Sequence, residues 1–124
     1  MTTMPKTHAA MGQHMKQCIE LCQQCYQVCS ELLSSGLGRS TISSHEVTLR
    51  LLQDCAEICQ VSANFMLRSS EFHTQTCGVC AAICLRCAEA CEENSADSRL
   101  QHCADVCRQC AESCQLMMAM DESR

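Results

Sequence analysis

The stretch CADVCRQCAESC, residues 103–114, places cysteine at successive steps of four, three and four residues. The stretch CIELCQQCYQVC, residues 18–29, repeats this spacing, and CGVCAAICLRCAEAC, residues 77–91, alternates steps of three and four. Cys55 and Cys59 form a shorter example. Because an α-helix advances about 3.6 residues per turn, such steps keep all the thiols of one stretch on one helix face. Helices turn such a face toward a shared core, so the spacing predicts a core lined by thiols.

The composition favours helix throughout the chain. Among 124 residues there are one proline, four glycines and an aromatic share of only 2%. Turn-rich and sheet-rich folds need more of these residues, whereas the abundant Ala, Leu, Gln, Glu and Met are good helix formers. The length suits a single packed core. We therefore expect one all-α domain that spans residues 1–124.

Turn and capping residues divide the chain into four helices. Ser43 with Glu46 forms a capping-box pattern, and the serines at 69–70 and the Asn-Ser pair at 94–95 are typical helix caps. The predicted helices span about residues 8–34, 41–68, 70–93 and 95–120. The connections between them are short, so neighbouring helices should be antiparallel. The predicted fold is an antiparallel up-down-up-down four-helix bundle with a cysteine-lined core.

The same helical phase predicts different side chains at the two ends of the core. One end should collect Met and His residues, namely Met11, His14, Met15, Met66, His73, Met117 and Met118. The opposite end should be closed by Leu32, Leu33, Thr48, Leu52 and Leu100, with His45 nearby. Methionine sulfur and histidine nitrogen are metal ligands, although methionine is also ordinary core filler. The first end is therefore the candidate entrance for a metal.

Charge and hydropathy argue against several partners. The net charge is −5 and the basic residues are scattered, which does not favour nucleic acid. No stretch reaches the roughly 18 apolar residues expected of a membrane-spanning helix. The first residues have no apolar segment typical of an export signal, so we expect a cytoplasmic protein. Thiols stay reduced there, so dense cysteine favours metal binding over disulfides.

The ligand type narrows the choice of metal. Thiolates select soft ions, chiefly Cu(I), Zn(II) and the iron of iron–sulfur clusters. A Zn(II) ion with four thiolates leaves two uncompensated negative charges, and burying unpaired charge is costly. One Cu(I) per thiolate instead neutralises the core. We therefore predict several Cu(I) ions per chain, with these ligands: Cys18, Cys22, Cys25, Cys29, Cys55, Cys59, Cys77, Cys80, Cys84, Cys87, Cys91, Cys103, Cys107, Cys110 and Cys114.

The repeated CxxxCxxCxxxC pattern, from 18–29 to 103–114, resembles the copper storage proteins, the family of cysteine-rich four-helix bundles that bind Cu(I). The resemblance implies a Cu(I) store, often tetrameric, of the cytosolic branch. It also implies that methionine or histidine at the open end takes part in copper uptake, a role that would fall to Met11, Met15, Met66 and His73. The predicted helix over residues 41–68 departs from the family pattern: it carries only two cysteines and has Thr48, Leu52 and Ser62 in the lining phase, which implies a lower capacity.

Other functions remain open at this point. The thiols could serve a zinc or general heavy-metal buffer like metallothionein, or a thiol redox sensor. No GxSxG, HExxH or phosphate-loop motif is present, so the sequence favours a binding protein over an enzyme. The apolar residues outside the cysteine faces favour a homo-oligomer. The pattern leaves the roles of His14, His45, Met117 and Met118 undecided.

Overall fold

The computed structural model describes residues 3–35, 46–93 and 96–122, with side chains from residue 12 to residue 120 of these ranges. Four helices make up almost all of this part of the chain: α1 (Thr3–Ser34), α2 (Glu46–Leu67), α3 (His73–Glu92) and α4 (Ser98–Glu122). The described ranges contain no β-strand. The predicted all-α class is confirmed.

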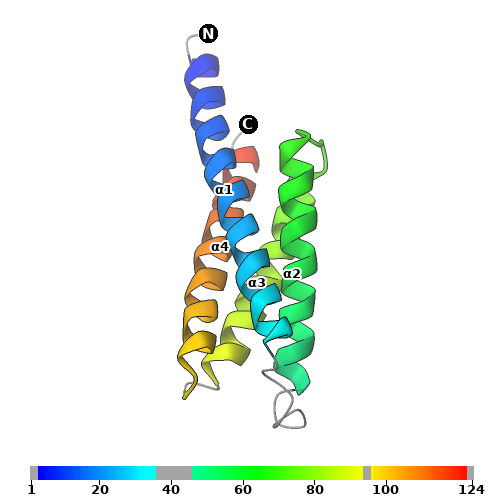
Figure 1. Cartoon of the computed structure of the whole chain (residues 1–124). Helices are drawn as coiled ribbons and strands as arrows, with labels where there is room; N and C mark the ends of the chain where they lie inside the picture. Colours follow the sequence, from blue (N-terminus) through cyan, green and yellow to red (C-terminus); the bar gives the residue numbers. More distant parts are fainter. Residues whose placement is uncertain (1–2, 36–45, 94–95, 123–124) are drawn as a thin grey trace.

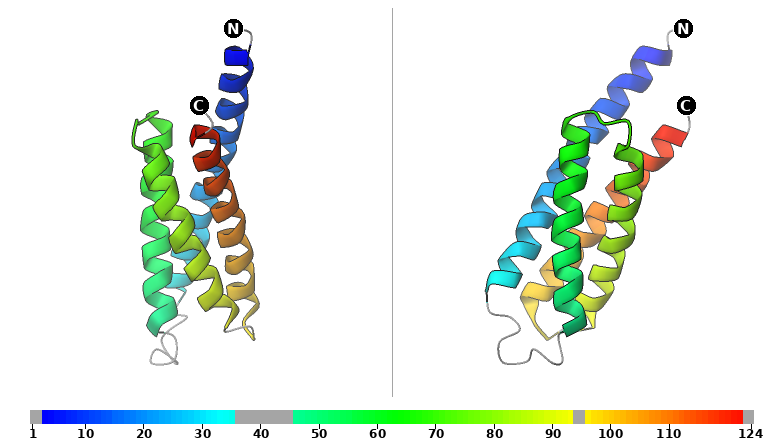
Figure 2. Two further views of the ribbon diagram at one scale, coloured as in Figure 1. Left: turned by 180° about the vertical axis from the view of Figure 1, so that it is seen from behind. Right: turned by 90° about the vertical axis from the view of Figure 1, so that its right-hand side faces the viewer.

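The helices run alternately up and down and form a four-helix bundle (Figure 1). Each helix packs against two others, α1 against α2 and α4, and α3 against α2 and α4, while the diagonal pairs have no close backbone approach. Both chain ends and the turn between α2 and α3 lie at one end of the bundle, and α1 projects beyond the other helices there (Figure 2). We call this end the mouth, defined by Met15, Met66, His73 and Met117.

Small residues explain how closely the helices pack. Ala81 and Ala88 of α3, and Ala104 and Ala111 of α4, are buried, and α3 and α4 share the most extensive interface. A methyl group in place of a long side chain lets two helix backbones approach closely. The backbones can therefore surround a narrow core that short cysteine side chains are able to fill.

The opposite end, which we call the base, is filled by larger residues. Leu32, Thr48, Leu52 and Leu100 are buried there, one or more from each of three helices. None of these side chains is a good ligand for a soft metal ion. Of the residues predicted to close this end, these four are buried and Leu33 is half-buried.

The helix ends differ from the sequence-based bounds in ways that local hydrogen bonds explain. α1 begins at Thr3 rather than near residue 8, since Pro5 is well tolerated in a first helical turn. α3 begins at His73 rather than residue 70: the hydroxyl of Ser70 accepts the Phe72 N–H at 3.1 Å, ahead of the helix. Ser70 thus helps to form the turn, but Phe72 holds the cap position.

α4 begins at Ser98, after a cap that the sequence analysis missed. The carboxylate of Asp97 accepts the Arg99 N–H at 2.9 Å, and the Asp97 carbonyl accepts N–H groups of Leu100 and Gln101. Aspartate is a strong N-cap residue, so Asp97 itself carried the signal. The caps predicted at Ser43 and at residues 94–95, and His45, lie outside the described residues.

Within the described residues, no helix is long and apolar enough to cross a membrane.

Candidate metal centre

The core consists mainly of sulfur. All fifteen cysteines have 0% exposed surface, and all are free thiols rather than disulfides. They come from all four helices, because the steps of three and four residues keep each row on the inward face. The structure therefore places every cysteine singled out by spacing in one common core.

The sulfurs form successive layers between mouth and base, which we name by their residues. The mouth ring contains Cys18, Cys77 and Cys114, with Ser62 in the α2 position. The upper ring contains Cys22, Cys59, Cys80 and Cys110. The lower ring contains Cys25, Cys55, Cys84 and Cys107. The inner ring contains Cys29, Cys87 and Cys103, with Leu52 in the α2 position. Cys91 lies beyond it toward the base.

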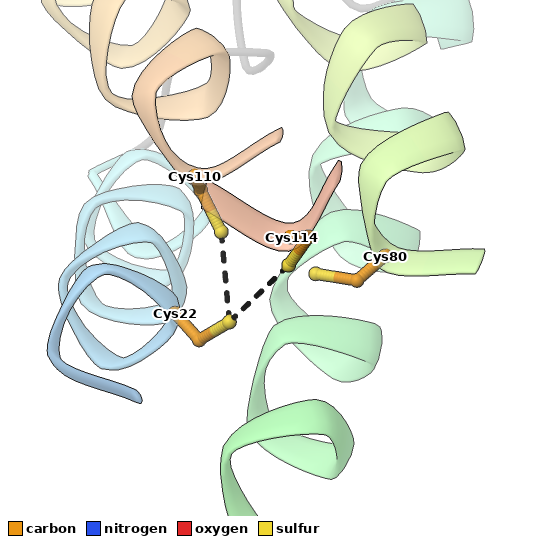
Figure 3. A group of neighbouring side chains, drawn as sticks. All are labelled: Cys22, Cys80, Cys110 and Cys114. Atoms are coloured by element: carbon orange, nitrogen blue, oxygen red, sulfur yellow. Dashed lines mark hydrogen bonds between the residues drawn. The ribbon is translucent and has the colours of Figure 1, made fainter. Parts of the chain in front are cut away.

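Neighbouring rings are close enough to form a continuous column of sulfur. Cys22 Sγ lies 3.6 Å from Cys110 Sγ in its own ring and 3.9 Å from Cys114 Sγ in the mouth ring. Figure 3 shows these two contacts, with the thiol of Cys80 directed toward the same space. Further along the column, Cys84 Sγ lies 3.7 Å from Cys59 Sγ of the ring above. An ion held in one ring can therefore reach ligands of the next.

Several groups of four cysteines are compact enough to hold a metal ion. In each group the four sulfurs lie within 4.8 Å of one another, as in the group of Cys22, Cys80, Cys110 and Cys114. The groups overlap: Cys25, for example, belongs to two of them, once with Cys84 and once with Cys107. Overlap means that one sulfur would serve more than one ion. The column suits a metal whose ions share bridging thiolates.

The buried thiols of the metal-free core cannot all ionise together. Hydrogen bonds from several neighbours, Cys114 first, lower the pKa of Cys110. The contact with Cys110 in turn raises the pKa of Cys59, and burial raises it further. A thiolate at one position is thus stabilised only while the thiols around it keep their protons. Filling the column with thiolates requires metal cations to replace those protons.

The residues at the mouth are placed differently from one another. Met66 is buried and its Sδ lies 3.8 Å from Cys77 Sγ, which makes it continuous with the mouth ring. Met117 is also buried, whereas Met15 is half-buried and packs against the core. Met11 belongs to α1, but its side chain lies outside the described set. Two of the four predicted non-cysteine ligands, Met15 and Met66, therefore contact the core.

His73 has a defined tautomer at this end. Its Nδ1 lies 2.8 Å from the carbonyl oxygen of Ser70, so Nδ1 carries the proton and donates it. Its Nε2 is buried and has no hydrogen-bond partner among the described residues. A neutral imidazole with a carbonyl on one nitrogen and a free lone pair on the other is the form that binds metals. His14 differs, because its Nε2 contacts the Ser113 carbonyl at 3.1 Å.

Four antiparallel helices around a column of sulfur define a cysteine-lined metal-binding bundle. The sequence profile described as copper storage protein matches residues 11–119. The chain belongs to the copper storage protein family.

Solved structures are similar over most of their length. A crystal structure of a Nitrosospira multiformis protein is 41% identical, covers 87% of this chain and 97% of its own, and has a TM-score of 0.78. A Cu(I)-bound copper storage protein of Bacillus subtilis is 31% identical and has a TM-score of 0.78, and the match covers 85% of this chain and 98% of the Bacillus chain. A cytosolic copper storage protein of Streptomyces lividans is 26% identical and has a TM-score of 0.84, and the match covers 90% of this chain and 97% of the Streptomyces chain.

Proposed function

We propose that this chain stores and buffers several Cu(I) ions as ligand-bridged clusters inside the bundle. One observation carries the proposal: all fifteen thiols converge in a solvent-inaccessible column with neighbouring sulfurs at hydrogen-bonding distance. Such a column offers soft ligands in overlapping groups, and monovalent Cu(I) can neutralise it one thiolate at a time. The proposed ligands are the fifteen cysteines named above. Membership of the family and the Cu(I)-bound Bacillus relative support this choice of metal.

Zinc is the second candidate, because the compact four-cysteine groups also suit a tetrahedral ion. Two features weigh against it. Each four-thiolate Zn(II) site leaves two buried negative charges. The overlap of the groups at residues such as Cys25 also means that ions with four ligands of their own would leave some of the groups unused. A redox sensor is less well supported, since the thiols are inaccessible to a solvent oxidant.

Copper enters at the mouth in this proposal. Met15, Met66 and His73 lie at that end, and Met11 precedes Met15 by one helical turn. Neutral sulfur and imidazole ligands bind Cu(I) without the charge that would hold it permanently. They would pass the ion to Cys77 and the mouth ring. At the base, Leu32 and Leu100 supply no ligand.

We further propose that the protein works in the cytoplasm as a homo-oligomer, with a tetramer as the expected form. The Streptomyces relative, described as cytosolic, supports the location. Exposed apolar side chains such as Val47, Val61 and Val79 support an interface between chains. Light scattering of the purified protein and fractionation of expressing cells test the two statements.

Anaerobic titration of the reduced protein with Cu(I), followed by metal analysis, tests the storage function. We expect well over four equivalents per chain, because the four rings and Cys91 together supply fifteen thiols. In a second experiment Zn(II) and Cu(I) compete for the same reduced protein, and Cu(I) should be the ion that stays bound. Saturation below about four equivalents would contradict storage, and retention of zinc against copper would favour the second candidate.

A further inference from the structure

The mouth ring lacks one soft ligand that the upper and lower rings have. Ser62 occupies the α2 position, and its hydroxyl is buried 3.6 Å from Cys77 Sγ. A hydroxyl is a hard donor that stays protonated at neutral pH, whereas Cu(I) prefers sulfur. The mouth ring can therefore supply three thiolates, one fewer than either of the two rings beneath it.

Ser62 also affects the thiolate that it contacts. Once Cys77 has lost its proton, the Ser62 hydroxyl can donate a hydrogen bond to the sulfur. Hydrogen bonds to a ligating sulfur reduce the electron density that it gives to the metal. On its other side Cys77 contacts Met66 Sδ, which is uncharged. An ion at Cys77 is thus surrounded by weaker ligands than an ion in the upper ring.

The inner ring provides an internal comparison. It also has three thiols, since Leu52 takes its α2 position. However, it lies at the base, where Leu32 and Leu100 close the bundle. An ion there lies farther from the mouth than an ion in any of the other three rings. Only the mouth ring combines a missing ligand with a place next to the half-buried Met15 and His73.

We propose that the mouth ring is an exchange layer, in which Ser62 keeps Cu(I) weakly bound so that it is the first copper to be given up to an external ligand. This inference rests on the proposed Cu(I) storage function. The upper and lower rings then form the retained store. Release proceeds in two stages, because copper from the upper and lower rings must refill the mouth ring before it can leave.

Competition with the chromophoric Cu(I) chelator bicinchoninate, under anaerobic conditions on fully loaded protein, tests the exchange layer. The wild type should release copper in a fast minor phase and a slow major phase. In Ser62→Cys the fourth thiolate should slow the fast phase by about tenfold or more, which corresponds to about 1.4 kcal/mol. Leu52→Cys is the matched control: it adds a thiol to the inner ring and should leave the rate of the fast phase unchanged.

A second variant keeps the test decisive if Ser62→Cys does not fold. Cys77→Ser leaves two thiolates in the mouth ring, so the amplitude of the fast phase should fall while the slow phase keeps its rate. An unchanged fast phase in Ser62→Cys, or loss of the slow phase in Cys77→Ser, would overturn the exchange layer. Failure of the wild type to bind Cu(I) would instead overturn the storage function.

Discussion

The thioether sulfur of Met66 lies 3.8 Å from the thiol sulfur of Cys77, so a soft but uncharged ligand directly borders the column of thiols. The two residues come from the end of α2 and the start of α3, which the turn between these helices brings together at the mouth. In the proposed uptake route, this contact would give an incoming Cu(I) ion a ligand between solvent and the first thiolates. The mouth is therefore chemically different from the storage rings, and it can be tested separately.

Replacement of the mouth ligands should slow uptake without reducing capacity. In Met66→Leu the side chain keeps its approximate volume and loses its sulfur, so we expect the initial rate of Cu(I) uptake to fall severalfold. Stopped-flow measurement with a Cu(I)–chelator complex as donor gives the rate, and metal analysis gives the final stoichiometry. A lower stoichiometry with an unchanged rate would mean that Met66 is a storage ligand instead.

His73 provides an independent test of uptake. His73→Ala removes the Nε2 lone pair that has no partner among the described residues, and should likewise slow uptake severalfold at pH 7. His102→Ala, a change at an exposed histidine of α4, is the matched control. An equal effect of both changes would argue against a specific role for His73.

The reduced, metal-free protein should lose stability at alkaline pH. The contact with Cys103, together with burial, raises the pKa of Cys91 to about 12. The contact with Cys110 and burial likewise raise the pKa of Cys80 to about 11. In the unfolded chain a cysteine has a pKa of about 8.5. A thiol whose pKa is raised by folding stabilises the native state fully below about pH 8.5.

That stabilisation is lost as the pH rises through the unfolded-state pKa toward 11 or 12, because Cys80 and Cys91 ionise easily in this range only in the unfolded chain. Urea unfolding of the apo protein at several pH values between about 7 and 10.5 measures the effect. We expect the midpoint to fall steadily above about pH 8.5. Copper-loaded protein should not show this fall, because its thiolates are already ionised.

Copper binding should release protons into the solution. The buried thiols of the metal-free core cannot all ionise together, and each protonated ligand must lose its proton before it binds. Titration of weakly buffered protein with Cu(I), monitored with a pH indicator, should therefore release about one proton per thiol that becomes a ligand. A total release close to zero would mean that the cysteines are not the ligands.

Ser69→Gly should stabilise the bundle. Ser69 has φ 54°, a left-handed conformation, directly after α2. The Ser70 N–H donates to the Phe65 carbonyl at 2.9 Å and the Ser69 N–H to the Met66 carbonyl at 3.0 Å, which is the pattern of a Schellman motif. The left-handed conformation costs a non-glycine residue about 1 kcal/mol, so glycine should raise the free energy of unfolding by up to that amount. Ser35→Gly, at the end of another helix, is a useful comparison.

Much of this architecture follows from local patterns along the chain. The alternating steps of Cys18 to Cys29 and of Cys103 to Cys114 predict helix and an inward face together, since only a helix puts those thiols on one side. The bounds of the helices were less predictable. Asp97 and Ser70 act through hydrogen bonds to particular backbone groups, and several nearby polar residues could have done the same.

Relations between helices could not be obtained from spacing alone. The row Cys18 to Cys29 specifies which face of α1 turns inward, but the distance from Cys25 to Cys55 or Cys107 depends on how closely the helix backbones approach. That approach is a property of each pair of helices together, which the sequence of α1 alone does not determine. The tautomer of His73 likewise depends on a carbonyl oxygen brought into place by the turn after α2.

Periodicity along the chain was thus sufficient for the choice of helix, the inward faces and the soft-metal chemistry, because these are properties of residue type and of the helical repeat. Which sulfurs share an ion, and why Ser62 leaves the mouth ring one thiolate short, emerged only from packing in three dimensions. Contacts between residues distant in the chain depend on the axial register of neighbouring helices, which no single helix encodes.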